Sequence, residues 1–528
     1  MMKVRPAHLA ITVAVGLSLT ACASGESILN AGNDGRPTTT VGTTQPGGSN
    51  SSATTIQLFP SDQPATPATS PTATTIQLFP QTDASGFARA VDYAPCPIDA
   101  LDEASEPVNI TFWHGMQSGN EIALQDLVEE YNASQDRVVV ELQNQNGYEE
   151  LVDKYFQSSQ ADRPHLIQLP EYMLQQMADT NTVVSSTACI QAEGYDTTAF
   201  LPRALLAYQT GGVQWGMPFN ISNPILYYNR VAFEEAGLDP DQPPVTLDEL
   251  REYSQQIIDS GASTYGIALD SGINSGGGWF LEQWLARAGL PYADNGNGRE
   301  ARATQVLFNS PEAAAMLEQA QSLVTDGLAV YVGENPQGLD ALLQIADPDA
   351  PAAMAIATSG ALGAVISGVE GGLIPGVTVD DIGVGAMPGP TDTPSAIVGG
   401  AALYIVRDKG DAEAAAAWDF VKFLDSPESQ AYWADATGYV PIRTESVELD
   451  PLAQRYADDP RYLVAFDQIN FAADDFTAVG PVLGPLRQIR GVTATMMADI
   501  YNGTPVEDAL AAAAEEANLL IVEYDNRN

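Results

Sequence analysis

From about residue 107 onward, segments in which hydrophobic residues recur every second position alternate with segments in which they recur about every 3.6 positions. Val108 to Trp113 has the period of two that is typical of a half-buried strand, and Ser118 to Tyr131 has the 3.6-residue period of an amphipathic helix. A strand at Val138 to Leu142, a helix at Tyr148 to Ser158 and a strand at His165 to Leu169 repeat this order. Such alternation predicts βαβ units, and therefore a parallel sheet with helices on both faces.

The second half of the chain continues this pattern, so an α/β fold is predicted throughout. Further strands are predicted at Tyr265–Leu269, Met354–Ala357, Gly383–Ala386 and Ala396–Val406. The strand at Met354–Ala357 is interpreted as a return to the sheet of the first half. Helices are predicted at Trp279–Ala288, Pro311–Asp326, Ala412–Leu424, Pro485–Tyr501 and Pro505–Leu520.

Ligands of open α/β sheets bind outside the carboxyl ends of the strands. The loops at Trp113–Ser118, Gln145–Tyr148 and Pro170–Tyr172 follow three predicted strands and should lie along one rim. Topology alone therefore makes Tyr148 and Glu171 candidate binding residues.

A second candidate feature is the small polar segment Thr358-Ser359-Gly360, which precedes a predicted helix. Free backbone N–H groups and the helix dipole make such a segment a natural anion site. Another predicted helix begins after Thr246, where Glu249 three residues later completes a capping box.

The front of the chain has a different composition. Residues 1–22 carry Lys3 and Arg5, then the apolar run Leu9 to Leu19, and end in the lipobox-like Leu-Thr-Ala-Cys22. This pattern predicts a lipoprotein signal peptide with Cys22 as the lipidated residue; an ordinary signal with an incidental cysteine is the alternative. Residues 23–106, rich in Thr, Ser, Gly and Pro, are predicted to be a disordered tether.

The tether contains one exact repeat, since the sequence ATTIQLFP occurs at 53–60 and again at 73–80. Duplicated linker is the preferred interpretation, and a pair of docking motifs is the alternative. With Cys22 set aside, Cys96 and Cys189 remain, an even pair in an exported protein. They are predicted to form a disulfide, with two buried thiols as the alternative.

Charge and composition narrow the function classes. The 22 basic and 68 acidic residues give a net charge of −46, which excludes nucleic acid and anionic membrane surfaces as partners. Three histidines are too few for a His-rich metal cluster, and neither a Gly-x-Ser-x-Gly elbow nor a P-loop occurs. No enzyme activity and no cofactor or metal is expected. His114 is interpreted as a hydrogen-bonded rim residue, with ligand contact as the alternative.

Several separated motifs occur in an order that resembles one family. They are Phe112-Trp-His-Gly115, Pro218-Phe-Asn220, Leu226-Tyr-Tyr-Asn229, Gly399-Gly400, Gly438-Tyr439 and Gln488-Ile-Arg490. From Pro107 to Glu523 the chain is similar to the extracellular solute-binding proteins that deliver ligands to ABC importers. It is most similar to the subfamily that binds sn-glycerol 3-phosphate and glycerophosphodiesters.

The resemblance implies a two-lobe, periplasmic-binding-protein-like fold with a hinge and a ligand cleft. Its lobes would be 107–219 plus 357–404 and 220–356 plus 405–528, with crossovers near Asn220, Ile356 and Tyr404. It also implies a monomeric, extracytoplasmic receptor, held to the cell membrane by its lipid anchor, whose partners are a permease, an ATPase and a small phosphorylated glycerol ligand.

Carried over residue by residue, the resemblance implies a ligand site made of Tyr148, Glu171, Ser222, Thr358, Ser359, Gly400, Tyr439 and Arg490. Arg490 would be the charged anchor of a phosphate. Leu247 stands where some members have a tryptophan against the glycerol moiety, which favours a bulkier glycerophosphodiester; a helix-core role is the alternative.

Three other function classes remain open. A sugar or oligosaccharide receptor of the same family would use stacking aromatic rings, for which Trp113, Trp215 and Trp279 are available. A secreted hydrolase would turn its ligand over. An adhesion or scaffold protein would have no small-molecule affinity.

Overall fold

The structure is a computed structural model that describes residues 94–528, except for 335–338, 375, 394 and 473–474. The predicted signal segment, Cys22 and both copies of the ATTIQLFP repeat lie outside the described residues. In the described part of the chain, no helix has the length and apolar character needed to cross a membrane.

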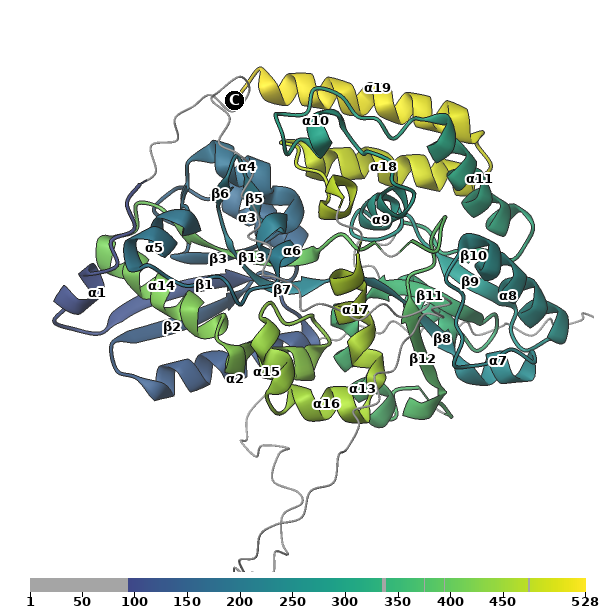
Figure 1. Cartoon of the computed structure of the whole chain (residues 1–528), viewed down its shortest axis with the longest axis horizontal. Coiled ribbons are helices and arrows are strands. Elements are labelled where there is room, and N and C mark those ends of the chain that lie inside the picture. The colour runs from purple at the N-terminus through teal and green to yellow at the C-terminus, as the bar shows by residue number, and fades with distance from the viewer. Residues whose placement is uncertain (1–93, 335–338, 375, 394, 473–474) are drawn as a thin grey trace, which may run out of the picture. The chain divides into compact units, whose positions relative to one another are not determined.

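The first sheet contains the strands that the sequence predicts for the front of the fold (Figure 1). Its order is β2-β1-β3-β13-β4, and β7 pairs with β13. β1 runs parallel to β2 and β3, whereas β13 runs antiparallel to its neighbours. The strand bounds are β1 Val108–His114, β2 Val138–Asn144, β3 Leu166–Pro170, β4 Val183–Val184, β7 Met217–Ser222 and β13 Gly399–Val406.

The second sheet has the order β10-β9-β11-β8-β12 and mixes parallel with antiparallel pairs. Its strands are β8 Pro224–Asn229, β9 Tyr265–Leu269, β10 Ala329–Tyr331, β11 Ala352–Thr358 and β12 Ile382–Ala386. A separate hairpin pairs β5, Gln209–Thr210, with β6, Val213–Gln214. We call each large sheet, with the helices that pack on it, a lobe.

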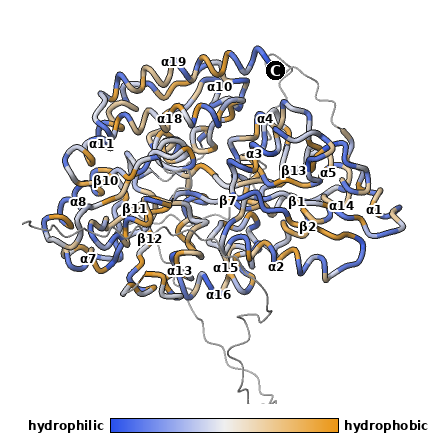
Figure 2. Tube along the Cα trace, turned by 180° about the vertical axis from the view of Figure 1, so that it is seen from behind, coloured by the Kyte–Doolittle hydropathy of each residue, from blue (hydrophilic) through white to orange (hydrophobic). Residues whose placement is uncertain are grey.

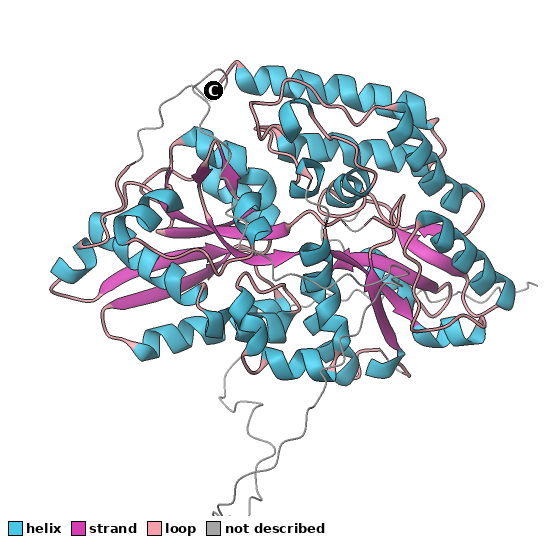
Figure 3. Ribbon diagram, in the orientation of Figure 1, coloured by secondary structure: helices cyan, strands magenta, loops and turns pink. Residues whose placement is uncertain are grey.

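Helices cover both sheets, and Figure 3 shows them on either side of the strands. In the first half of the chain they are α1 Ala100–Glu103, α2 Ser118–Ser134, α3 Tyr148–Gln157, α4 Leu174–Thr180, α5 Ser186–Glu193, α6 Pro202–Ala207, α7 Arg230–Glu235 and α8 Leu247–Ser260. They continue as α9 Trp279–Arg287, α10 Asp294–Asn297, α11 Pro311–Thr325, α12 Asp340–Leu343, α13 Leu362–Glu370, α14 Asp411–Leu424 and α15 Pro427–Thr437. The last four are α16 Leu452–Asp458, α17 Leu463–Phe471, α18 Leu486–Tyr501 and α19 Val506–Asp525.

The hydrophobic pattern explains where these helices pack. Hydrophobic and hydrophilic residues alternate along α19 in Figure 2, and its buried residues, Ala509, Ala513 and Ala517 among them, recur every four residues. That face packs on α18 and α11. The predicted capping box also forms, because the Glu249 N–H donates to Thr246 Oγ1 at 3.1 Å and the Thr246 N–H donates to Glu249 Oε2 at 3.1 Å.

Two strand placements differ from the expectation. Ile356 lies inside β11 and pairs with Leu226 of β8, so this strand belongs to the second sheet and does not return to the first. β12 also joins the second sheet. An apolar strand that is buried on both faces carries no pattern that tells which sheet it enters, which explains the error.

The expected crossovers near Ile356 and Tyr404 are therefore not found at those positions. The chain passes from the first sheet to the second between β7 and β8, and it returns between β12 and β13. Tyr404 pairs with Ile167 inside the first sheet, and the following α14 packs on β1. The segment after residue 404 thus begins in the first lobe.

The expected tether ends earlier than residue 106. Cys96 forms a disulfide with Cys189 of α5, and both residues are buried. Leu101 of α1 is also buried, and α1 packs against α14. The covalent bond and this apolar contact together hold residues 96–103 on the first lobe.

We expect the disulfide to contribute to stability by restricting the unfolded chain. It closes a loop with a sequence separation of 93 residues, for which the chain-entropy estimate is about 4 kcal/mol. The double variant Cys96→Ser/Cys189→Ser should lose up to this amount of unfolding free energy in urea titrations. A reductant should lower the urea midpoint of the wild type by the same amount as the double substitution does, and it should leave the midpoint of the double variant unchanged. A shift in the double variant would contradict this assignment.

Candidate binding site

A chain of hydrogen bonds runs along the carboxyl ends of the first-lobe strands and ends at Tyr148. The Gly115 N–H donates to Gln168 Oε1 at 3.0 Å, and Gln168 Nε2 donates to Asn220 Oδ1 at 2.7 Å. Asn220 Nδ2 then donates to the Tyr148 hydroxyl at 2.8 Å. A backbone N–H can only donate, so it fixes the direction of every bond in the chain. The Tyr148 oxygen is an acceptor, and its proton is directed elsewhere.

Tyr439 lies beside Tyr148. Its ring stacks on Trp433, with centroids 5.6 Å apart, and it lies so close to Gly360 that a Cβ there would be 2.6 Å from the Tyr439 Cζ atom. Burial raises the pKa of Tyr439, and hydrogen bonds with Asn220 and Tyr148 oppose the rise. The predicted pair Tyr148 and Tyr439 is thus brought together, and Gly360 makes room for it.

The second part of the site is an ion cluster around Arg490, which we call the inner ion cluster: Arg490, Glu171 and Glu282. Arg490 Nε and Nη2 lie 2.7 and 2.8 Å from the two oxygens of Glu282. Nη2 also lies 2.8 Å from Glu171 Oε1. The side chains of Arg490 and Glu282 are 2% and 1% exposed, so both charges are removed from water.

This cluster joins the two lobes. Glu171 begins the 3-10 turn η2, Glu171–Met173, directly after β3 of the first sheet, whereas Arg490 lies on α18 and Glu282 on α9. Burial raises the pKa of Glu171; Arg490 opposes that rise and Glu282 reinforces it. Burial alone would lower the pKa of Arg490, but the two carboxylates raise it above its ordinary value.

The pairing changes how the predicted roles of Arg490 and Glu171 must be understood. The resemblance made Arg490 the anchor of a phosphate and placed Glu171 in the same ligand site, but in this structure the two side chains contact each other. Two ionised carboxylates and one guanidinium would carry a net negative charge, which disfavours an added anion. An anionic ligand at Arg490 therefore requires Glu171 to move away or to become protonated.

The other predicted residues divide into three groups, of which the first borders Asn220. Ser222 is buried and pairs with Gly399, and Gly400 has a φ of +91°. A Cβ at Gly400 would be 1.9 Å from the Asn220 carbonyl oxygen, so glycine is required there. These residues thus border Asn220 of the hydrogen-bond chain.

The helix-start segment is also near the tyrosine pair. Thr358 Oγ1 accepts from the Gly360 N–H at 3.2 Å and caps the 3-10 turn η4, Ser359–Ala361, so its hydroxyl is partly used. Ser359 is 1% exposed, and its hydroxyl has no hydrogen-bond partner among the described residues.

Leu247 does not join either part of the site. It is buried at the start of α8, and its N–H donates to the Gly389 carbonyl at 2.8 Å. Gly389 packs against Arg287, which ends α9 about 12 Å along the helix axis from Trp279. These contacts favour the helix-core role for Leu247.

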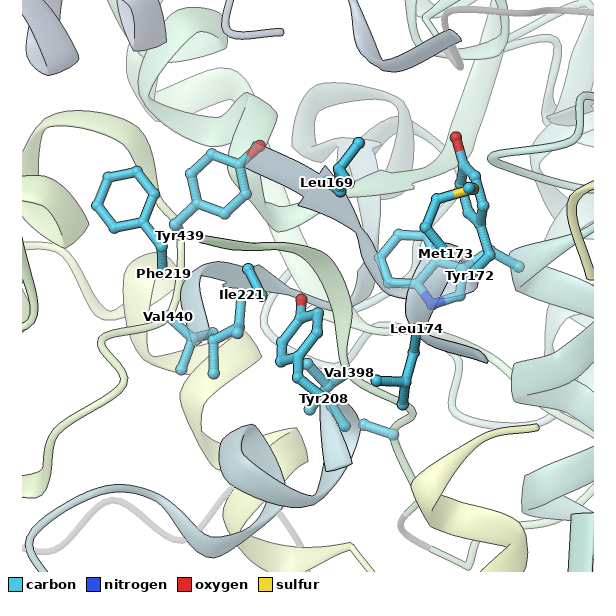
Figure 4. Close-up of a cluster of buried hydrophobic side chains, with 14 of the residues drawn as sticks. Leu169, Tyr172, Met173, Leu174, Tyr208, Phe219, Ile221, Val398, Tyr439 and Val440 are labelled. Atoms are coloured by element: carbon cyan, nitrogen blue, oxygen red, sulfur yellow. The ribbon is translucent and has the colours of Figure 1, made fainter. Parts of the chain in front are cut away.

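Several buried polar groups at the site were not identified as hydrogen-bond donors from the sequence. Tyr208 OH, Tyr404 OH and Trp279 Nε1 are buried without a hydrogen-bond partner among the described residues. The charge of Glu171 acts on both tyrosines and, after burial, helps to raise their pKa values. Figure 4 shows the hydroxyls of Tyr208, Tyr439 and Tyr172 among otherwise apolar labelled side chains. Only their place in the fold identifies these tyrosines, since the chain contains 20 of them.

A small cavity with room for about one water molecule lies beside the inner ion cluster. Glu171, Glu282, Arg490 and Arg299 contribute to its lining. Within the described residues, no group of three or more His, Cys, Asp or Glu side chains is arranged to hold a metal ion. Arg299 is already bonded to the backbone carbonyls of Gly480 and Val479. The site therefore offers the Arg490 guanidinium, two carboxylates and several neutral donors to a ligand.

The inner ion cluster should dominate the response to mutation of acidic residues. We expect Glu282→Ala to lower the free energy of unfolding by about 3–5 kcal/mol, because it removes the bidentate partner of a buried guanidinium. Glu523→Ala is the control, because it breaks an exposed ion pair: the side chains of Arg527 and Glu523 are 71% and 67% exposed. It should lower the free energy of unfolding by less than about 1 kcal/mol. Equal urea midpoints for the two variants would show that the inner pairing is energetically unimportant.

Comparison with known proteins agrees with this architecture. The family model described as bacterial extracellular solute-binding protein matches residues 126–462. The sn-glycerol-3-phosphate-binding periplasmic protein UgpB of Pectobacterium atrosepticum is 28% identical over 437 residues, which cover 80% of this chain and 93% of that protein.

Two solved structures share the fold. UgpB from Mycobacterium tuberculosis in complex with glycerophosphocholine has a TM-score of 0.66 and 22% identity, covering 80% of this chain and 99% of that one. The cyclic alpha-maltosyl-1,6-maltose binding protein from Arthrobacter globiformis has a TM-score of 0.63 and 23% identity, and the match covers 79% of this chain and 99% of that one. The predicted two-lobe α/β fold is confirmed, and the chain belongs to the bacterial extracellular solute-binding proteins.

Proposed function

We propose that this protein is the ligand-binding receptor of an ABC importer and that its ligand is sn-glycerol 3-phosphate or a glycerophosphodiester. Family membership supports the receptor role, and the similarity to UgpB proteins supports the ligand class. The observation that carries the proposal is Arg490. It is a buried guanidinium at the contact of the two lobes, held by the carboxylates of Glu171 and Glu282.

Phosphate binding at Arg490 involves an exchange of partners. Nε and Nη2 of Arg490 both donate to the carboxylate of Glu282. Nη1 makes no hydrogen bond to a described residue. The ligand phosphate takes Nη1 and replaces Glu171, which then accepts hydrogen bonds from the glycerol hydroxyls. Glu282 keeps the planar guanidinium oriented for a bidentate contact.

Neutral donors complete the site. The Tyr148 hydroxyl accepts from Asn220 and hydrogen-bonds in turn to Tyr439, whose own proton is left for a ligand. Tyr439, Ser359 and the indole N–H of Trp279 add donors from other segments of the chain. Such donors suit an anion in a protein whose net charge of −46 repels anions at long range, because they add attraction without requiring more basic residues.

The sugar-receptor alternative is less well supported by the geometry. Stacking on a sugar needs an accessible ring face, but Trp113, Trp215 and Trp279 are only 4%, 5% and 5% exposed. Lys154 Nζ also lies 4.1 Å from the Trp113 ring centroid and covers that ring. A hydrolase and a scaffold protein have no specific observation in their favour.

The remaining parts of the proposal concern the whole chain. Cleavage before Cys22 and lipidation of that residue would anchor a monomeric receptor to the outer side of the cell membrane, with residues 23 to about 95 as its tether. The bound ligand would be delivered to a permease driven by an ATPase. The receptor itself would catalyse no reaction and need no cofactor.

Calorimetry with glycerol 3-phosphate, glycerophosphocholine and maltose tests the ligand class. We expect both phosphate compounds to bind and maltose not to bind. Arg490→Ala should weaken phosphate binding by about tenfold or more, because charge-assisted hydrogen bonds contribute about 1.5–3 kcal/mol. Arg490→Lys, which keeps the charge but loses the planar fork, should also weaken it and serves if Arg490→Ala does not fold.

Tyr148→Phe gives a milder test, since it removes the hydroxyl that hydrogen-bonds to Tyr439 and positions it. One neutral hydrogen bond is worth about 0.5–1.5 kcal/mol. We expect a loss of phosphate-ligand affinity of about two- to tenfold. Tyr253→Phe is the matched control, because the Tyr253 hydroxyl donates to Gln242 on the surface of the second lobe. Binding of maltose but of neither phosphate compound, or unchanged affinity in the Arg490 variants, would refute the assignment.

A further inference from the structure

A second ion cluster crosses between the lobes further out than the first. Arg487 of α18 lies 2.7 Å from Glu149 and 2.6 Å from Asp153, both on α3 of the first lobe. The three side chains are 26%, 24% and 54% exposed, compared with 2% and 1% for Arg490 and Glu282. We call these three residues the outer ion cluster.

Tyr172 connects the outer cluster to the inner one. Its ring centroid lies 5.1 Å from the Arg490 Cζ atom, and its hydroxyl donates to Glu149 Oε1 at 2.5 Å. Arg487 also precedes Arg490 by three residues on α18, about 4.5 Å along the helix axis. A group that extends from a phosphate held at Arg490 therefore reaches the outer cluster.

The loop before α9 borders both clusters. Asn274 Nδ2 lies 3.4 Å from Glu149 Oε1, and a Cβ at Gly278 would be 3.0 Å from the Arg490 Cδ atom. The loop ends at Trp279, whose buried indole N–H has no partner among the described residues. The loop thus lies against both ion clusters and ends in a buried donor whose ring packs against Gly399 of β13.

The charges of the outer cluster are unbalanced. One guanidinium faces two carboxylates, so Glu149 and Asp153 keep an excess of negative charge next to the path of a phosphate substituent. A cationic substituent can take the place of Arg487 against Glu149. A neutral substituent displaces the guanidinium without replacing its charge, and an anionic one would add repulsion.

We propose that Glu149 and Arg487 set the head-group preference of this receptor and that they favour glycerophosphodiesters with a cationic head group. The inference deepens the proposed function and rests on it. Glu149 is the attractive residue for the head group, and Arg487 is its competitor, bound to Glu149 when no cation is present. Neither residue is needed for binding of the phosphate itself.

The test compares the affinities of glycerophosphocholine and glycerophosphoglycerol, which differ in head-group charge, by calorimetry on the full-length protein. We expect the wild type to prefer the choline compound by about three- to tenfold, the size expected for a partly exposed charge pair. Glu149→Gln should lower this ratio towards one. Arg487→Gln should raise it by about threefold, because it removes the competing cation.

A substitution that alters lobe closure changes the affinities of both ligands by the same factor, so the ratio of the two affinities does not change. Asp179→Asn is the matched control: Asp179 pairs with Arg302 across the same two lobes but contacts neither ion cluster, so the ratio should not change. No wild-type preference, an unchanged ratio in Glu149→Gln, or shifts of the same sign in both variants would overturn the inference.

The result also separates this inference from the proposed function. If glycerol 3-phosphate and both diesters bind but the ratio does not respond to Glu149, only the head-group assignment is wrong. If none of the three binds the wild type, the proposed function is wrong and the head-group assignment falls with it.

Discussion

The pairing of one buried guanidinium with two carboxylates is the constraint on which the contact between the lobes depends. A buried charge that loses its partner is strongly destabilising, so Arg490 must be satisfied in every state in which it is removed from water. Glu282 supplies a permanent fork, and Glu171 supplies a contact that exists only when the first lobe is close. The arrangement makes lobe closure sensitive to whatever occupies the place of Glu171.

The hydrogen-bond chain from Gly115 to Tyr148 complements this charged cluster because it has one fixed direction. It begins at a backbone N–H, which cannot reverse, and passes through the buried side chains Gln168 and Asn220. The site thus combines a charged part that can exchange partners with a neutral part that cannot. This combination suits a ligand with one anionic group and several hydroxyls.

The sequence predicts local structure well wherever one pattern determines it. The period of β1 and α2, the capping box at Thr246 and the Cys96–Cys189 pair are all present in the structure, because each depends on neighbouring residues or on simple counting. The sheet entered by β11 could not be predicted, since a strand buried on both faces has no distinctive pattern.

The candidate site, too, was predicted in part and missed in part. The resemblance to a family indicated Tyr148, Tyr439, Glu171 and Arg490, and the structure brings these residues into two adjoining groups. It did not indicate Glu282, because one more acidic residue among 68 has no distinguishing feature in a sequence. Which carboxylate neutralises Arg490 is decided by the packing of α9 against α18, and packing is not visible in a sequence.

The scarcity of basic residues gives the lobe contact its particular chemistry. With 68 acidic residues against 22 basic ones, both lobes carry excess negative charge and repel each other on approach. Cations at the contact offset this repulsion, and the structure concentrates them there. The arginines that bond across the lobes are Arg203, Arg299, Arg302, Arg487 and Arg490. Arg203 and Arg299 donate to backbone carbonyls and the other three to carboxylates. The two acidic lobes are therefore joined by arginines as well as by apolar contact.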